Sequence, residues 1–525
     1  MPEKWGRSCA GLLVAAAILS APRAARGSGE CEDDAARDSE ACVQLDKVQV
    51  DIQRLDAQRL VERADKLADP AAAQPLFERA GTAYLDTYRI YCEEPGRNQR
   101  TPHVDPRACE EIAFNAARAF VAARRTVKAV VVYKMIVLDD ERTRRGSALA
   151  AKATFQLGAS YQSMALYEEA ADWYERFATL HPRDAEAVAA LSDAVILRLG
   201  LGQDAAATKD VAMFLKNWGF TKRVEVAQLE LAMATHQSEH GERERARATV
   251  RGAMEMLDRG PIDLTIRAHA LAATLAETAI GAREEHAKVL AAWADAEAGE
   301  LALRRGWPGE SEGQLDRRLA RVLNAVGAAR FAAAEERRRA EVESLKFPVY
   351  AGTIERVALS AYAQSTLRDW YVKKRAAIER IEPEYIKVLE IRPVPSPAWV
   401  IASAAAVGAM WGELADDFRR VPAPAAWKKD PLLNKAYFDA IEAMSEPIRT
   451  RFAKPAMKKC ADLSVKYQYA DASSRACVAW LVSHYKTEFP AVDELIPAFR
   501  DPPGPASALW RQDPPLRAPL LPPDR

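Results

Sequence analysis

The sequence lacks an excess of charge of either sign, because its 525 residues contain 74 lysines and arginines and 74 aspartates and glutamates. A chain of zero formal net charge has no electrostatic reason to bind nucleic acid or an anionic membrane as a whole. It also lacks the alternating apolar and polar pattern of β-strands, and its alanine-rich, charge-rich segments repeat at helical spacing instead. The sequence therefore predicts an all-α protein with no nucleic-acid partner.

Motifs that carry catalysis are scarce. There is no P-loop and no G-x-S-x-G, and the seven histidines are scattered. Gly200 and Gly202 begin a dinucleotide-loop pattern, but they follow a predicted helix instead of a strand, so the phosphate-binding geometry is missing. Asp416 and Asp417 are neighbours, and neighbouring residues of a helix point apart, which favours a solvated helix face. We expect no enzymatic activity, no cofactor and no small-molecule substrate.

One zinc-enzyme motif is present. His236, Glu239 and His240 spell H-x-x-E-H, the inverted zinc-protease motif. A working site needs both histidines on one helix face and a third ligand from a separate element. Here His240 falls in the last turn of a predicted helix and Gly241 opens the next connection, so we interpret the three residues as solvent-facing. A zinc hydrolase that uses them is the alternative hypothesis.

The first 27 residues have the pattern of a cleaved signal peptide. Lys4 and Arg7 precede a twelve-residue apolar core at residues 10–21, which is too short to span a bilayer comfortably. Small residues at Ala25 and Gly27 place the cleavage near Gly27. The sequence thus predicts export, with a retained N-terminal anchor as the alternative.

The cysteines agree with export. With Cys9 set aside, six remain in three local pairs: Cys31 and Cys42, Cys92 and Cys109, Cys460 and Cys477. No C-x-x-C occurs, which disfavours a structural zinc site. In an oxidising compartment each pair would join two neighbouring helices, and pairing of neighbours closes the shortest loops. Six buried free thiols are the alternative.

The most informative segment is residues 153–182, ATFQLGASYQSMALYEEAADWYERFATLHP. It matches the 34-residue tetratricopeptide pattern at seven positions, of which only the first departs from the usual tryptophan. These positions are Thr154, Leu157, Gly158, Tyr161, Ala170, Tyr174 and Pro182. The pattern requires small residues where two helices cross, aromatic rings that fill the space between them, and a proline that ends the second helix. The segment therefore resembles a tetratricopeptide repeat.

Weaker copies flank this repeat. Residues 114–138 carry Ala117, Phe120, Ala129 and Tyr133 at equivalent positions, and three further helix pairs follow. The pairs cover residues 187–218, 226–257 and 263–294. Their spacing drifts to about forty residues, which predicts a degenerate array of helical hairpins that must stack on one another to bury a face.

The whole chain divides by pattern into six parts. We expect a signal peptide at 1–27, an N-terminal helical region at 28–110, tetratricopeptide-like repeats at 111–300, long helices at 301–392, a C-terminal helical domain at 393–500 and a proline-rich tail at 501–525. The predicted fold is a helical-hairpin solenoid followed by long helices and a C-terminal helical domain.

Three features of the C-terminal half predict local structure: a proline within a helix, an apolar run with two glycines, and a run of arginines. A long helix pattern is interrupted at Pro383. The apolar run from Trp399 to Gly412 is too short and too alanine-rich to span a membrane, and Gly408 and Gly412 mark close helix packing in a soluble core. The run of three arginines at 337–339 is typical of a solvated helix face.

The first helix of a stacked repeat lines the concave face of the array. In the clearest repeat the exposed positions are Lys152, Phe155, Ala159, Gln162 and Ser163. The resemblance implies that such faces hold extended peptides or partner helices, and one cation, one aromatic ring and small polar groups suit a peptide of mixed polarity. Plain surface is the alternative for each residue. Pro519 and Pro522 of the tail have P-x-x-P spacing and form a second candidate binding motif, although the pattern favours an unstructured tail.

The C-terminal third carries a further resemblance. The run PVPSPAWVIA at 393–402, the G-x-M-W-G motif at 408–412 and the cysteine pair around Lys-Tyr-Gln-Tyr look like the end of periplasmic tetratricopeptide proteins associated with adventurous gliding motility. The resemblance covers roughly residues 310–498. It implies a non-enzymatic periplasmic scaffold or adaptor of an envelope-spanning complex, with envelope proteins, including outer-membrane components, as partners. An adaptor for outer-membrane protein assembly or polysaccharide export is the alternative.

Overall fold

A computed structural model describes residues 39–92 and 104–490. Those residues form helices joined by short connections and include no strand, so the all-α prediction is confirmed. The chain divides into two compact units after Asp210, here called unit 1 and unit 2. The predicted signal peptide and the proline-rich tail lie outside the described residues.

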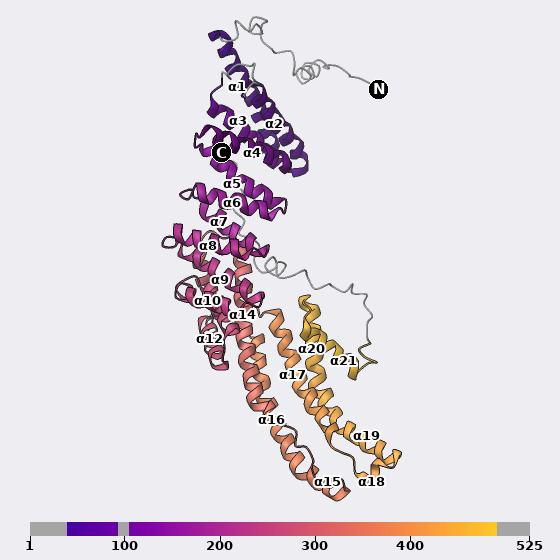
Figure 1. Ribbon diagram of the computed structural model, residues 1–525. Helices are drawn as coiled ribbons and strands as arrows, with labels where there is room; N and C mark the ends of the chain where they lie inside the picture. The colour runs from indigo at the N-terminus through magenta and orange to yellow at the C-terminus, as the bar shows by residue number, and fades with distance from the viewer. Residues whose placement is uncertain (1–38, 93–103, 491–525) are drawn as a thin grey trace, which may run out of the picture. The chain divides into compact units, whose positions relative to one another are not determined.

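Unit 1 is a series of helical hairpins in which each of the first six helices packs against the next one along the chain (Figure 1). Its elements are α1 (Glu40–Asp65), α2 (Pro70–Tyr91), α3 (Pro106–Ala122), α4 (Thr126–Thr143), α5 (Ala148–Ser163), α6 (Tyr167–Leu180), α7 (Ala187–Gly200) and the first half of α8 (Asp204–Trp218). The predicted repeat positions of α3 and α4 all lie in the core, since Ala117, Phe120, Ala129 and Tyr133 are at most 1% exposed. This serial packing is the helical-hairpin solenoid that the sequence predicts.

Unit 2 begins with further hairpins and continues into longer helices. The hairpin helices are α9 (Arg223–Glu239), α10 (Arg243–Asp258), α11 (Ile262–Leu275), α12 (Ala279–Ala292) and α13 (Ala296–Gly306). The later helices are α14 (Glu312–Arg337), α15 (Arg356–Tyr362), α16 (Arg368–Leu389), α17 (Pro397–Asp417), α18 (Ala425–Lys428), α19 (Pro431–Ile448), α20 (Lys454–Tyr467) and α21 (Ala472–His484). Single π-helical turns follow α14, α15 and α19, at Arg338–Glu343, Ala363–Leu367 and Arg449–Ala453.

The predicted interruption at Pro383 is wrong, because α16 runs through it without a break. Pro383 is exposed, whereas Ile381 and Tyr385 on either side are at most 1% exposed. The proline removes one backbone hydrogen bond on the solvent side, where a helix bends most easily, and burial of the opposite face keeps both halves helical.

Helix α17 packs closely in the core, as its two glycines predict. A Cβ atom on Gly408 would lie 2.8 Å from Met457 Cγ of α20, and one on Gly412 would lie 3.1 Å from Trp480 Nε1 of α21. The length prediction for this segment is wrong: with the 3₁₀ turn that follows, Pro397–Arg420 is, within the described residues, long and apolar enough to cross a membrane by length and composition. More than half of its apolar window, 56%, is nevertheless buried by other helices.

Two disulfides join neighbouring helices in the way the cysteine spacing predicts. Cys92 is bonded to Cys109 between α2 and α3, and Cys460 is bonded to Cys477 between α20 and α21. Cys42 in α1 is also disulfide-bonded, while Cys31 lies outside the described residues. These bonds are compatible with an oxidising compartment.

Candidate interaction surfaces

The hairpin of α5 and α6 is organised by one close contact between a glycine and a tyrosine. Ser147 starts α5 by accepting a hydrogen bond from the N–H of Leu149 at 3.1 Å. A Cβ atom on Gly158 would lie 2.5 Å from Tyr174 Cδ1, so only glycine allows the ring to sit there. The Tyr174 hydroxyl donates to Gln162 Oε1 at 2.8 Å and fixes the ring.

The other repeat positions lie where this packing places them. Leu157, Ala170 and Tyr174 are completely buried, and α6 ends at Leu180, two residues before Pro182. Tyr161 differs from the expectation, because it is half-buried and its ring lies 5.3 Å from Lys134 Nζ of α4. Its ring therefore also contacts the preceding hairpin.

The predicted binding face of α5 needs one correction. Phe155 is only 2% exposed, and its ring packs against Tyr174 and Phe177 of α6 with centroid distances of 5.7 and 5.4 Å. Phe155 therefore belongs to the face of α5 that packs on α6, within the same hairpin, and not to the open face. Of the remaining predicted residues, Lys152, Ala159 and Gln162 are half-buried and Ser163 is exposed. The available surface is thus polar and has no aromatic anchor.

A buried arginine lies among acidic side chains in the same unit. Arg198 of α7 donates from Nε to Glu175 Oε1 of α6 at 2.6 Å and also pairs with Asp172. Asp210 of α8 is only 3% exposed, and burial, reinforced by the charge of Glu175, raises the pKa of Asp210 to about 7. This cluster is a local electrostatic feature that changes charge near neutral pH.

The H-x-x-E-H residues do not form the arrangement that a zinc enzyme needs. His236 is completely buried, which corrects the prediction that all three residues face solvent. The His240 ring lies against the His236 ring, with centroids 3.9 Å apart, and its Nδ1 is 2.8 Å from the His236 carbonyl oxygen. Glu239 is exposed, and Gly241 follows with a φ of 80° that ends the helix. Over the part of the chain that the structure describes, no group of three or more histidine, cysteine, aspartate or glutamate side chains could hold a metal ion.

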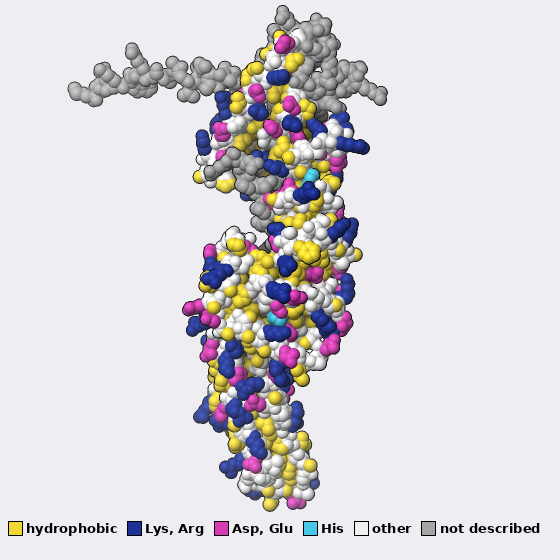
Figure 2. All heavy atoms as spheres, turned by 90° about the vertical axis from the view of Figure 1, so that its left-hand side faces the viewer, with side chains coloured by type: hydrophobic (Ala, Val, Ile, Leu, Met, Phe, Trp, Pro, Cys, Tyr) yellow, Lys and Arg dark blue, Asp and Glu magenta, His cyan; other side chains and the backbone are white. Residues whose placement is uncertain are grey.

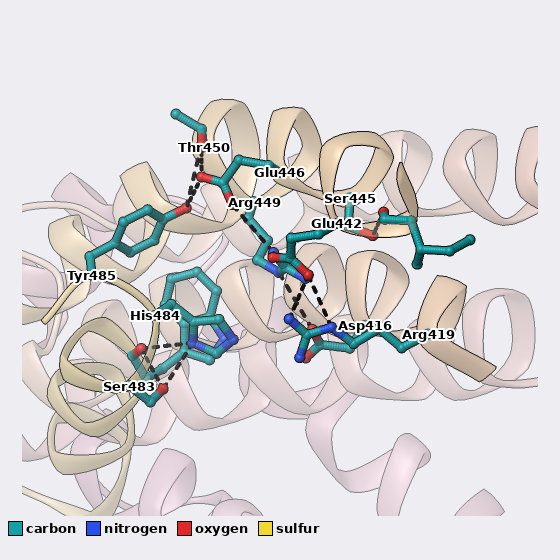
Figure 3. Close-up of polar contacts among 12 residues, drawn as sticks. Asp416, Arg419, Glu442, Ser445, Glu446, Arg449, Thr450, Ser483, His484 and Tyr485 are labelled. Carbon is teal, nitrogen blue, oxygen red and sulfur yellow. Dashed lines mark hydrogen bonds and ion pairs between the residues drawn. The ribbon is translucent and has the colours of Figure 1, made fainter. Parts of the chain in front are cut away.

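A polar cluster in unit 2 surrounds Arg449, at the π-helical turn after α19 (Figure 3). Arg449 is 2% exposed and makes two contacts with Glu442, one of them 3.3 Å from Nη2 to Oε2. It also lies 3.3 Å from Glu446 and 3.4 Å from Asp416 of α17. Asp416 is therefore part of an ion-pair cluster, which corrects its assignment to a purely solvated face. Hydrogen bonds from Arg449 hold the pKa of Glu442 below its usual range.

The cluster continues to the last helix of the described chain. Glu446 Oε1 accepts hydrogen bonds from Thr450 at 2.7 Å and from the Tyr485 hydroxyl at 3.3 Å. Lys454 Nζ lies 4.3 Å from the centre of the Tyr485 ring. Because the three acidic side chains are 41–46% exposed, the cluster offers solvated carboxylates held in fixed positions by a buried cation. Sequence reasoning missed it because its residues come from separate helices.

Charge is mixed across the surface. On the face shown in Figure 2, lysine and arginine side chains are interspersed with aspartate and glutamate. Of the arginine run at 337–339, Arg337 and Arg339 are exposed, and Arg337 pairs with Glu341 at 3.0 Å. The outer two arginines therefore match the solvated helix face that the sequence predicts, whereas Arg338 is half-buried and pairs with Glu335 at 2.9 Å.

The chain matches no protein-family model and no curated protein. Among solved structures it is similar to "Structure of Naa15/Naa10 bound to HypK-THB", with a TM-score of 0.28 and 13% identity over 83% of this chain and 55% of that chain. It is also similar to "Circular tandem repeat protein with novel repeat topology and enhanced subunit contact surfaces", with a TM-score of 0.16 and 11% identity over 86% of each chain. The chain thus spans about half the length of the first of these, and similarities this low carry no functional argument.

Proposed function

We propose that the protein is a non-enzymatic scaffold that holds partner proteins on the faces of its helical repeats. The observation that carries this proposal is the serial hairpin packing of unit 1, since such arrays expose long, continuous surfaces built from many short elements. The zero net charge and the mixed surface charge favour protein partners over nucleic acid.

We further propose that the scaffold works in the periplasm, as part of an envelope-spanning complex such as gliding-motility machinery. The predicted signal peptide supports export, and the disulfides Cys92–Cys109 and Cys460–Cys477 are compatible with an oxidising compartment. The assignment to gliding machinery rests on the resemblance of residues 310–498 alone.

The partner surface that we propose on unit 1 is the open part of α5, formed by Lys152, Ala159, Gln162 and Ser163. Phe155 is left out because it is core. Half-buried polar groups beside a small alanine suit the backbone and polar side chains of an extended peptide. Binding there would depend on hydrogen bonds and one cation more than on an apolar anchor.

The proposal is tested by recovering the tagged, exported protein from crosslinked cell envelopes and identifying the bound proteins by mass spectrometry. The test variant combines Lys152→Glu with Ser163→Arg, and Glu169→Lys at an exposed position of α6 is the control for a change of surface charge outside the α5 face. Envelope-machine subunits that are lost with the first variant and retained with the control support the α5 face. Subunits retained with both place the contact elsewhere, and recovery of outer-membrane assembly factors alone refutes the gliding assignment.

A further inference from the structure

An open hollow of about 1090 Å³ lies within unit 2. Three segments form it: the start of α13, the middle of α14, and the end of α16 with the loop that follows. A volume at the upper end of ligand-pocket sizes, with a wide opening, suits several residues of a chain better than an enclosed small molecule.

The floor of the hollow is apolar and rigidly held. Trp293, Val326 and Ile391 line it and belong to one core cluster, each at most 7% exposed. Trp293 Nε1 donates to the carbonyl oxygen of Arg392 at 3.2 Å, which ties the end of α12 to the loop after α16. On the other side, α13 carries Gly299, where a Cβ atom would lie 2.6 Å from Trp293 Cζ3. The indole ring is therefore fixed from two directions.

The walls carry charges of opposite sign. Asp295, Glu297 and Glu300 of the α13 segment lie on one side, and Asp295 already accepts a hydrogen bond from the N–H of Ala298 at 3.0 Å as the helix cap. The other segments contribute Arg330 of α14, Lys387 of α16 and Arg392 of the loop, together with one acidic side chain, Glu390. Lys387 is paired with Glu384 at 2.7 Å.

These charges do not neutralise one another. Within residues 39–92 and 104–490, Arg330 and Arg392 form no ion pair, and neither do Glu297 and Glu300. Other arginines of unit 2, such as Arg318 and Arg338, are paired with carboxylates. The α13 segment of the hollow is thus acidic, and the α14 and α16 segments contribute two arginines without an ion pair beside Glu390.

We propose that this hollow binds an extended peptide segment of a partner protein, in which an apolar side chain stands between an acidic residue and a basic residue. The apolar side chain packs on Trp293, the acidic group pairs with Arg330 and Arg392, and the basic group pairs with Glu297 and Glu300. A segment with charge of one sign only would meet repulsion from one wall, so the mixed pattern sets specificity. This site is independent of the α5 face and does not rest on it.

A phage-displayed library of random dodecapeptides, selected on the full exported protein, tests the proposal. The expected result is enrichment of peptides with an acidic–apolar–basic pattern, and a loss of at least tenfold in the binding of those peptides to Arg330→Glu by fluorescence anisotropy. A repeat selection on Arg330→Glu should favour a basic residue where the first selection favoured an acidic one. Arg251→Glu, an exposed position of α10, is the control and should leave binding unchanged.

The exposed Arg392→Glu provides a second variant that does not depend on the half-buried Arg330 folding normally. It should weaken the same peptides while leaving the circular dichroism spectrum unchanged. Selection that yields no charge pattern, or selected peptides that bind both variants as tightly as the parent protein, would overturn the proposal. A variant of the α5 face should leave peptide selection unchanged, so failure of the scaffold proposal and failure of this one are distinguishable.

Discussion

Gly158→Ala should destabilise the protein even though alanine is the better helix former. Within a helix, the change from glycine to alanine gains about 1 kcal/mol from backbone propensity. Here the new Cβ atom would lie 2.5 Å from Tyr174 Cδ1 and 2.6 Å from Cε1. The ring cannot swing away, because Tyr174 is fully buried and its hydroxyl is bonded to Gln162. Overpacking of this kind costs roughly 1–3 kcal/mol, and two such close contacts place the cost near the upper end of that range. After subtraction of the gain in helix propensity, we expect the free energy of unfolding to fall by about 1–2 kcal/mol.

The same substitution at Gly252 is the matched control. Gly252 lies in α10, is exposed, and has no heavy atom within 4 Å of an added Cβ atom. Gly252→Ala should therefore raise the free energy of unfolding by about 1 kcal/mol. Urea denaturation of the full chain, followed by circular dichroism at 222 nm, measures both changes. Combining Gly158→Ala with Tyr174→Leu should remove most of the cost of the first substitution. A Gly158→Ala variant as stable as Gly252→Ala would refute the close packing of α5 and α6.

Three further predictions concern stability. Since burial and the charge of Glu175 raise the pKa of Asp210 from 3.8 to about 7 on folding, the folded state keeps a proton that the unfolded state loses, and stability should fall as pH rises between those values. Asp210→Asn should remove this fall and raise stability above pH 7, as measured by urea titrations across the pH range. Replacing both Cys92 and Cys109 by serine opens a loop of sequence separation 17 and should cost roughly 3 kcal/mol relative to the oxidised parent, with no difference under reducing conditions. Arg449→Met should lower the free energy of unfolding by about 1–2 kcal/mol at neutral pH. The loss is smaller than for a fully buried ion pair because water can hydrate the carboxylates that Arg449 leaves behind, and it should shrink in acid as those carboxylates become protonated. An equal loss at all pH values would contradict the ion-pair assignment.

The helices of the repeats were predictable because the residues that define one hairpin contact one another within that hairpin. Gly158, Ala170 and Tyr174 meet within a single helix pair, so their spacing along the chain is enough to place them. Burial from outside the hairpin leaves no such signal. His236 is buried in α9, which packs against α11 of the following hairpin as well as α10 of its own. Phe155 is buried against Tyr174 and Phe177 of its own hairpin, at a position that the repeat pattern does not specify.

The Arg449 cluster and the hollow at Trp293 were not predictable for a different reason. Each combines residues from separate helices, and the first depends on a π-helical turn. Such a turn inserts one extra residue into the helix. Side chains of α20 are therefore rotated about the helix axis by about 100° from the positions that an uninterrupted α-helix continuing from α19 would give them. Pro383 shows the opposite error: a local rule predicts a break that burial of Ile381 and Tyr385 overrides.

The two disulfides also determine how the chain would carry a mechanical load. In an array held together by contacts between neighbours, separation begins at the first and last hairpins, since each has a neighbour on one side only. Cys92–Cys109 fastens α2 to α3 near the start of the described chain, and Cys460–Cys477 fastens α20 to α21 near its end. Each disulfide would carry the tension across the loop that it closes. The residues inside the two loops therefore cannot be extended, even if the helices around them unfold. Extension would instead come from the helices between them, which are held together by noncovalent contacts.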